Sequence, residues 1–154
     1  FNTLHDIHKV GYVHRDLKPL NICLKNTVPY LIDFGLSKKI IVNKKHILEK
    51  NIKSIIGSYS FVSNNVKNNI EPSRRDDIES MLYILLFMFV DKTKESCFVG
   101  FNIKNEAIKD LIIDLNIIDI ECFKKILIYI KKMKFSQEPN YNYIIKELFI
   151  TKKK

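Results

Sequence analysis

Hydrophobic residues at the start of the chain repeat at the spacing of an α-helix. Phe1, Leu4, Ile7 and His8 fall on one face of such a helix, because residues three and four apart are neighbours on a helix surface. Gly11 follows shortly and is the residue type that most readily adopts the left-handed conformation in which many helices end. The pattern therefore predicts a helix that stops just before Gly11.

Two short apolar runs come next, at residues 22–24 and 30–32. Short apolar runs separated by turn-forming residues are typical of paired strands, so they predict a small β-hairpin. Residues 36–53 are rich in lysine and only weakly periodic, which predicts a surface loop. Residues 54–63 predict a second loop, and the asparagine-rich residues 64–69 predict a turn.

The second half of the chain carries the strongest helical patterns. Ser73 with Asp76 three residues later resembles a capping box, and residues 78–90 are apolar on nearly all sides, which predicts a helix buried within the domain. Residues 91–102 then predict a loop. The remaining helices are expected at residues 104–115, after an Asp119 cap with Ile120, Phe123, Leu127 and Ile130 on one stripe, and at residues 140–150 with Tyr141, Ile144, Ile145 and Leu148 inward.

The predicted fold is thus mainly α with a small β-hairpin. The 154 residues are 46% hydrophobic and 28% charged, a balance typical of one globular domain over residues 1–154. The apolar run at residues 81–90 is much shorter than the roughly 18 residues that suggest a membrane span. The N-terminus carries no signal-peptide pattern. We therefore expect no membrane partner.

The net charge limits the classes of binding partner, and the cysteine content limits the cellular compartment. The net charge is +9, and only three of the 26 basic residues are arginines. This charge favours acidic partners, although a lysine-rich solvated surface explains it equally well, and nucleic acid is disfavoured because arginine and aromatic residues are not interleaved. Three scattered cysteines without a C-x-x-C pair indicate a reducing compartment and no zinc site. We expect an intracellular protein, cytoplasmic or nuclear, in which His5 and His8 are structural.

The candidate chemistry lies in H-R-D-L-K-P-L-N at residues 14–21, followed by Asp33 of a D-F-G sequence. Phosphoryl transfer from a nucleotide needs a carboxylate that orients the hydroxyl, a cation near the phosphoryl group, and an amide with a second carboxylate for Mg²⁺. Asp16, Lys18, Asn21 and Asp33 are residues of these types. Because the predicted hairpin starts after Asn21 and ends before Asp33, both oxygen ligands are expected at the same end of it.

These motifs, in this order and spacing, are the signature of protein kinases, and the chain resembles the large C-terminal lobe of that family, more narrowly of casein kinase 1. The Ala-Pro-Glu motif that ends most kinase activation segments is missing, and S-N-N at residues 63–65 is similar to the Ser-Ile-Asn of casein kinase 1. S-R-R-D-D-I-E-S at residues 73–80 is close to that family's Ser-Arg-Arg-Asp-Asp-Leu-Glu-Ser. Residues 135–141, with Leu148 and Phe149, look like its closing helix pair.

The resemblance implies a serine/threonine protein kinase with ATP and Mg²⁺ as cofactors and a protein substrate, with acidic segments favoured by the charge. Asp16 would be the catalytic base, Lys18 would stabilise charge on the γ-phosphoryl group, and Asn21 would act in catalysis and in binding the nucleotide. Asn21 and Asp33 would hold the metal. Gly35 would give the backbone freedom after Asp33.

Further roles follow from the same resemblance. Asp77 would brace the backbone around His14, and Arg75 would anchor the activation segment by an ion pair. Arg15 is equally well explained as an anion contact or as local scaffolding. Helix caps and solvated first-turn charges explain Arg74, Asp76 and Glu79.

One departure from casein kinase 1 concerns substrates. Members of that family prefer substrates that are already phosphorylated, and the resemblance assigns the anion contact to an arginine. Ser60 stands at that position in this sequence, and a neutral hydroxyl cannot make a charge-assisted bidentate contact. Lys50 and Lys53 are the nearby cations that could compensate.

The larger departure is that the N-terminal small lobe is expected to be absent. Only 13 residues precede His14, and the chain contains neither G-x-G-x-x-G nor a V-A-I-K-like lysine, which kinases use together with the metal-binding groups. The chain is then either the large lobe of a longer kinase or a non-catalytic, pseudokinase-like module that binds acidic partners or a separate small lobe. In either case the apolar surface that faces the small lobe is predicted to be exposed.

Overall fold

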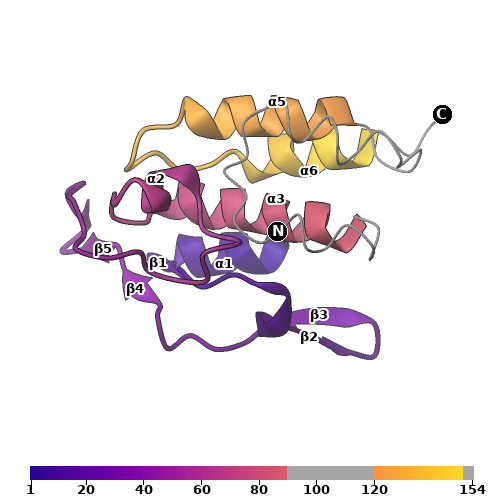
Figure 1. Cartoon of the computed structure of the whole chain (residues 1–154), viewed down its shortest axis with the longest axis horizontal. Helices are drawn as coiled ribbons and strands as arrows, with labels where there is room; N and C mark the ends of the chain where they lie inside the picture. The colour runs from indigo at the N-terminus through magenta and orange to yellow at the C-terminus, as the bar shows by residue number, and fades with distance from the viewer. Residues whose placement is uncertain (90–119, 151–154) are drawn as a thin grey trace.

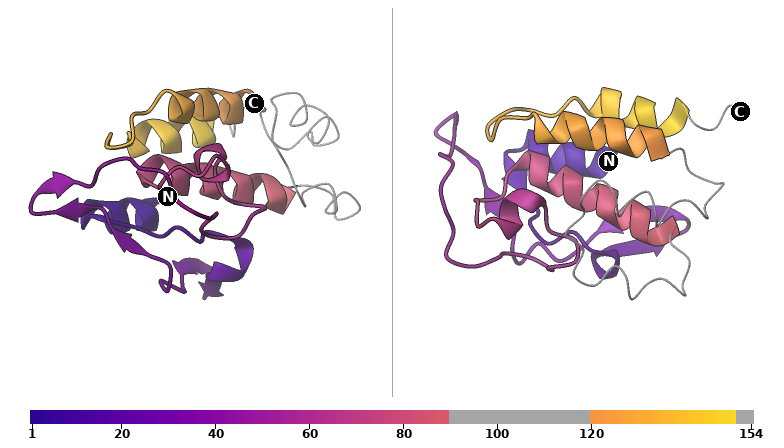
Figure 2. Two further views of the ribbon diagram at one scale, coloured as in Figure 1. Left: turned by 60° about the vertical axis from the view of Figure 1, so that its left-hand side comes forward. Right: turned by 45° about the horizontal axis from the view of Figure 1, so that its top comes forward.

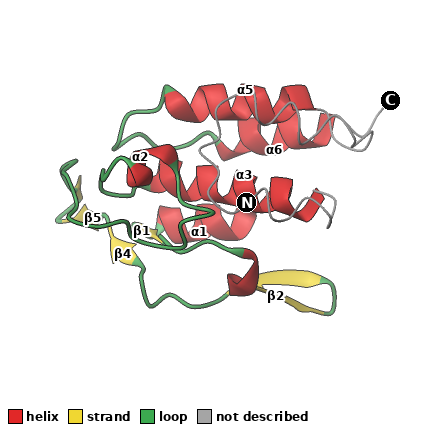
Figure 3. Cartoon of the chain, viewed as in Figure 1, coloured by secondary structure: helices red, strands yellow, loops and turns green. Residues whose placement is uncertain are grey.

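The structure is a computed structural model, and it describes residues 1–89 and 120–150. Helices dominate this part of the chain, and short strands occur in its first third (Figure 3). The helical elements are α1 (Asn2–Lys9), the 3-10 helix η1 (Pro19–Asn21), α2 (Asn64–Lys67), α3 (Arg74–Phe89), α5 (Ile120–Lys131) and α6 (Tyr141–Ile150).

The described strands form three separate antiparallel pairs. The predicted hairpin is confirmed as β2 (Ile22–Lys25) with β3 (Val28–Leu31), in a register that places Ile22 opposite Leu31. β1 (Tyr12–Val13) pairs with β4 (Lys38–Lys39), and β5 (Ile41–Val42) pairs with β6 (Lys45–His46).

The prediction of a surface loop without strands over residues 36–53 was therefore wrong in part. Three of the short strands lie in it, and Asn43 and Lys44 form the β5–β6 turn with φ values of +51° and +62°. Two-residue strands are too short to show a period of two, and the partner of β4 lies far away in sequence. Pairing with a distant strand forms β4, whereas β5 and β6 form a local hairpin that is too short to give a periodic signal.

Residues 64–69 also differ from the prediction of a turn, because α2 occupies most of them. The Ser63 side chain accepts a hydrogen bond from the N–H of Val66 at 3.2 Å, which is the interaction of an N-cap residue. The helix ends where Asn69 adopts φ +59°. One turn of helix buries a single apolar residue, Val66, and so leaves no periodic signal.

The helix α3 lies in the centre of the described structure (Figure 1) and most of its residues are buried, as predicted. Figures 1 and 2 show α1, α5 and α6 arranged around α3, and α1 also contacts α6, because the ring of His5 stacks on that of Tyr141 with centroids 4.4 Å apart. Helices packed around α3 explain why apolar residues surround it. The predicted cap at its start is confirmed, because the N–H of Ser73 donates to Asp76 Oδ2 at 2.8 Å. Residue 90 lies outside the described residues.

The C-terminal helices complete the core. In α5, Phe123, Leu127 and Ile130 are buried as the stripe predicted, and in α6 the inward residues Tyr141 and Ile144 are buried. The predicted helix at residues 104–115, the Asp119 cap and the side chain of Ile120 lie outside the described residues. Among the described helices, none combines the length and the apolar character that crossing a membrane requires.

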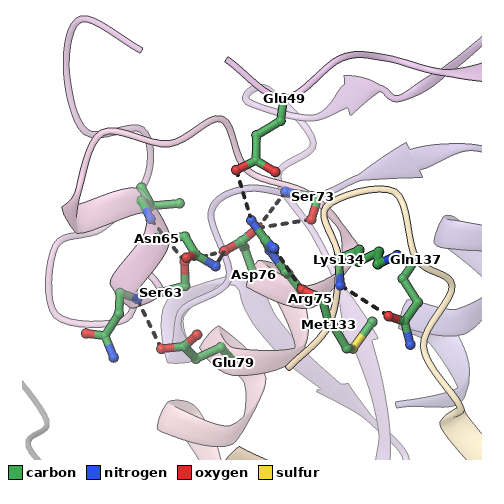
Figure 4. A network of polar contacts seen from close by, with 12 residues as sticks. Glu49, Ser63, Asn65, Ser73, Arg75, Asp76, Glu79, Met133, Lys134 and Gln137 are labelled. Carbon is green, nitrogen blue, oxygen red and sulfur yellow. Dashed lines mark hydrogen bonds and ion pairs between the residues drawn. The ribbon is translucent and has the colours of Figure 1, made fainter. Parts of the chain in front are cut away.

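Charged residues at the start of α3 form a buried polar network (Figure 4). Asp76 accepts hydrogen bonds from Ser63 Oγ at 2.6 Å, Asn65 Nδ2 at 3.0 Å and the backbone of Ser73. Glu79 accepts one from the N–H of Asn64 at 3.0 Å. Their role is structural, as predicted, but they are not solvated, because Asp76 and Glu79 are both buried.

We expect the stability contributed by Glu79 to fall as pH rises. Burial raises the pKa of Glu79, and hydrogen bonds from Tyr83 and Asn64 offset this only in part. Because the folded state binds this proton more tightly, its contribution is complete below the unfolded pKa of about 4.3 and is lost as pH rises through the folded pKa. Urea unfolding over a pH series should show wild type losing stability relative to Glu79→Gln as pH increases. A pH-independent difference would contradict the burial effect.

Candidate functional site

Three side chains hold the carboxylate of Asp16, which lies in residues 14–21, called the catalytic loop from here on. Lys18 Nζ donates to Oδ2 at 2.8 Å, and Asn21 Nδ2 donates to the same oxygen at 3.2 Å. Ser58 donates to Oδ1 twice, from its N–H at 3.0 Å and its Oγ at 2.8 Å. The Asp16 side chain is 7% exposed. The structure thus brings three of the four predicted site residues together around one carboxylate.

These contacts determine the charge state of Asp16. Burial alone would raise its pKa, but the hydrogen bonds from Lys18 and Ser58 and the Lys18 charge outweigh burial and hold the pKa below its ordinary value. Asp16 is therefore ionised at neutral pH. A carboxylate of low pKa can accept a hydrogen bond from a hydroxyl and orient it, and it is a weak base in the ground state.

Asn21 and Asp33 lie at the same end of the β2–β3 hairpin, as predicted. The N–H of Ile32 donates to the Asn21 carbonyl at 3.0 Å, which extends the hairpin by one step. The side chains differ in their surroundings. Asn21 is buried and its Nδ2 also donates to the carbonyl of Asp16 at 2.9 Å, whereas Asp33 is exposed. Among the described contacts, no hydrogen bond links the Asp33 carboxylate to Asp16 or Asn21.

The backbone around Asp33 differs from the expectation for Gly35. The left-handed conformation occurs at Asp33, with φ +61°, and not at the glycine. The Gly35 N–H donates to Asp33 Oδ1 at 3.2 Å, and a Cβ on Gly35 would lie 3.2 Å from that oxygen. The glycine therefore leaves room for the carboxylate instead of supplying an unusual φ. Phe34 packs against the ring of His14 with centroids 5.0 Å apart.

The donor set fits a hard divalent cation. Asn21 directs its amide nitrogen to Asp16, so its amide oxygen remains available as a ligand, and Asp33 offers an exposed carboxylate. Both are oxygen ligands of the kind Mg²⁺ prefers, and Mg²⁺ is commonly held by one or two carboxylates together with substrate phosphates and water. In the described part of the chain, no group of three or more His, Cys, Asp or Glu side chains is placed to hold a metal without such additional ligands.

The carboxylate of Asp77, in α3, binds the backbone of the catalytic loop, as the resemblance implied. Its Oδ2 accepts from the N–H of His14 at 2.7 Å, and its Oδ1 accepts from the N–H of Arg15 at 2.9 Å. His8 Nε2 donates to Oδ2 at 2.9 Å, and the Tyr141 hydroxyl bonds to His8 Nδ1. Burial raises the pKa of Tyr141, so this hydroxyl stays protonated. The network confirms that His8 is structural.

Arg15 makes local contacts in the described structure. Its backbone is left-handed with φ +69°, its Nε donates to the carbonyl of Leu36 at 2.6 Å, and its Nη1 lies 3.4 Å from Glu71 Oε1. Gly57 packs against its carbonyl so closely that a Cβ there would lie 2.3 Å from the oxygen. These contacts favour the scaffolding interpretation of Arg15.

Arg75 anchors the segment before α2, as predicted. Its Nη2 lies 3.6 Å from Glu49 Oε1, and its Nη1 donates to the carbonyl of Met133 at 2.8 Å. Figure 4 shows Arg75 reaching between these two parts of the chain. Its neighbour Arg74 is buried, with Nη1 3.5 Å from the carbonyl of Ser136, and so is not a solvated charge.

Ser58 is the site residue that sequence reasoning missed. It stands directly after Gly57, within the predicted loop at residues 54–63, and nothing in its local pattern marks it as a partner of Asp16, 42 residues earlier. The one local signal is the glycine, whose φ of +97° and missing side chain allow the chain to approach the catalytic loop. Of the two candidate compensating lysines, Lys50 lies 3.9 Å from Glu71, and Lys53 is exposed.

Comparison with known proteins places the chain in a family. A family model described as protein kinase domain matches residues 1–150. A probable casein kinase I homolog of Encephalitozoon cuniculi is 32% identical to this chain, and the match covers 93% of this chain and 48% of the homolog. The chain thus spans about half the length of this curated relative.

We expect Ser58→Ala to raise the pKa of Asp16. The substitution removes the hydroxyl hydrogen bond, which favours the ionised carboxylate, and leaves the backbone N–H bond in place. A carboxyl-carbon NMR titration would measure the shift. Ser58→Thr keeps a hydroxyl and should retain the low pKa, so equal values in both variants would show that the hydroxyl does not hold Asp16.

Proposed function

This chain belongs to the protein kinase family and is casein kinase 1-like, and we propose that it is the large lobe of an ATP- and Mg²⁺-dependent serine/threonine protein kinase. The main support for this proposal is the Asp16 carboxylate, which is ionised and is held in place by hydrogen bonds from Lys18, Asn21 and Ser58. A carboxylate that can accept a hydrogen bond from the substrate hydroxyl, a cation and an amide that can bind the metal are three of the groups that phosphoryl transfer needs.

Each residue has a distinct role in this proposal. Asp16 accepts a hydrogen bond from the serine or threonine hydroxyl of a protein substrate and orients its oxygen. Lys18, 2.8 Å from Asp16, is placed to balance negative charge that develops between nucleophile and phosphoryl group. Asn21 and Asp33 would hold Mg²⁺ with the phosphates of ATP. The bound Mg–ATP supplies the phosphoryl group and neutralises its charge.

An exposed apolar surface supports the assignment to the large lobe. The β2–β3 hairpin and the turn after it expose Leu24, Val28, Tyr30 and Phe34, Leu24 by 72% and Val28 by 51%. Apolar side chains gathered on one exposed hairpin usually meet another part of a protein. In the register of the hairpin Leu24 is opposite Pro29, so Val28 and Tyr30 point to one face and Leu24 to the other. We propose that a small lobe, the counterpart of the other half of the homolog's length, covers the face of Val28 and Tyr30.

Substrate and compartment follow from charge and thiol content. The net charge of +9 favours acidic segments in the protein substrate. Cys23 is exposed and Cys122 is buried, and both are free thiols, as expected in a reducing intracellular compartment. The kinase would then act in the cytoplasm or nucleus.

The alternative is a non-catalytic binding module, favoured by the exposed lysines around β4 to β6. Lys39, Lys44 and Lys45 are exposed there, and they could bind acidic partners without any phosphoryl transfer. Mg–ATP binding and phosphotransfer by the protein from its complete gene would exclude this alternative.

We expect Asp16→Asn to reduce phosphotransfer by about 10²- to 10⁴-fold, the usual contribution of a positioned acid–base group. The amide keeps the shape of the side chain but loses the charge that accepts the hydroxyl proton. Steady-state transfer of labelled phosphate to a serine-containing acidic protein would measure the loss. Normal turnover would refute the kinase assignment, provided that circular dichroism shows the variant to be folded.

We expect Asp33→Asn to weaken nucleotide binding only when Mg²⁺ is present. Asp33 is exposed and contributes one hydrogen bond, to Gly35, so its loss should leave the fold intact while removing a metal ligand. Calorimetric titration of ATP with Mg²⁺ and with EDTA would separate the two cases. Equal weakening in both would indicate that Asp33 does not act through the metal.

A further inference from the structure

An ion cluster outside the Asp16 group is centred on the buried side chain of Glu71. The Glu71 side chain is only 2% exposed, yet it meets cations from three segments. Arg15 Nη1 and Lys38 Nζ lie 3.4 and 2.8 Å from Oε1, and Lys50 Nζ lies 3.9 Å from Oε2. One buried carboxylate thus joins the catalytic loop, strand β4 and the chain after β6.

The backbone at Glu71 is bonded to the same region. We call residues 33–63 the activation segment, because they lie between the D-F-G motif and the cap of α2. The N–H of Glu71 donates to the carbonyl of Lys50 at 2.9 Å, and the N–H of Ile52 donates to the carbonyl of Asn69 at 2.8 Å. Asn51 and Ile70 form a β-bridge between these two bonds. Backbone hydrogen bonds therefore join the middle of the activation segment to residues 69–71.

The positive charges of Arg15 and Lys38 explain why an anion is needed where the activation segment is attached. Arg15 and Lys38 are largely withdrawn from water, with side chains 15% and 30% exposed. Without Glu71, two neighbouring cations would lose their counter-charge in a poorly hydrated site, which is strongly unfavourable. Lys50, 64% exposed, could simply turn into solvent and release the activation segment.

The cluster is also close to the chemistry. Arg15 directly precedes Asp16, and Gly57 packs against the Arg15 carbonyl immediately before Ser58 reaches Asp16. A shift of the activation segment would therefore withdraw two hydrogen bonds from the Asp16 carboxylate.

We propose that Glu71 is a positioning residue that orders the activation segment from within the chain. In many kinases this segment is ordered by a phosphate group that pairs with arginine after phosphorylation. Here the carboxylate of Glu71 provides the anion for Arg15 and for both lysines. The proposal rests on the proposed kinase function for its catalytic consequence, but the ordering itself does not depend on activity.

The test compares two substitutions that remove the same charge, in the protein expressed from its complete gene. Glu71→Gln neutralises the buried carboxylate with little change of shape. Glu121→Gln does the same on α5, in an exposed ion pair 3.6 Å from Lys124. Hydrogen exchange followed by mass spectrometry would report the amides of Ile52 and Glu71, and phosphotransfer assays would report kcat and KM.

For Glu71→Gln we expect at least tenfold faster exchange at these two amides and a tenfold or greater loss of kcat/KM, with no change in Glu121→Gln. In a Glu71→Ala variant, sodium sulfate should restore exchange protection more than sodium chloride at equal ionic strength. Unchanged exchange in Glu71→Gln, or equal recovery with both salts, would overturn the proposal. Faster exchange in a protein that shows no phosphotransfer even as wild type would uphold the ordering role and refute the kinase function.

Discussion

The geometry of the candidate site depends on the carboxylate of Asp77. Two consecutive backbone N–H groups of the catalytic loop donate to its two oxygens, and His8 donates to one of them. Asp77 belongs to the first turn of α3, a helix whose residues are mostly buried. The loop that carries Asp16 is thereby held against a rigid element and not by its own short-range contacts.

A second set of charges fixes the other side of the site. Glu71 forms ion pairs with Arg15 of the catalytic loop and with lysines of the activation segment. Gly57 lets the activation segment contact the catalytic loop closely, and Ser58 then donates a hydrogen bond to Asp16. Asp77 acts on the loop from the side of α3, and Glu71 acts from the side of the activation segment. Both use a buried carboxylate whose partners come from distant parts of the sequence.

Much of the helical fold and most of the site residues could be predicted because their signals are local. The apolar residues of α3, the stripe on α5 and the cap formed by Ser73 and Asp76 appear directly in the sequence. The close spacing of Asp16, Lys18 and Asn21 likewise placed them together. The β2–β3 hairpin could be predicted for the same reason.

What could not be predicted depends on contacts between distant residues. β4 exists because it pairs with β1, and Ser58 matters because it bonds to a residue 42 positions away. The buried states of Asp76 and Glu79 reflect the packing of α2 and its cap over the start of α3. Charge patterns alone suggested a solvated helix terminus, since a sequence does not show which elements cover it.

The left-handed backbone of Arg15 and Asp33 has a consequence for engineering. Each residue holds a positive φ without being glycine, a conformation that costs on the order of 1 kcal/mol or more and persists only where the surroundings enforce it. A peptide or foreign scaffold that carried residues 14–21 alone would relax to ordinary dihedral angles and scatter its functional groups. Transplanting this chemistry would require the buried acidic anchors and the glycine contact to be moved with it.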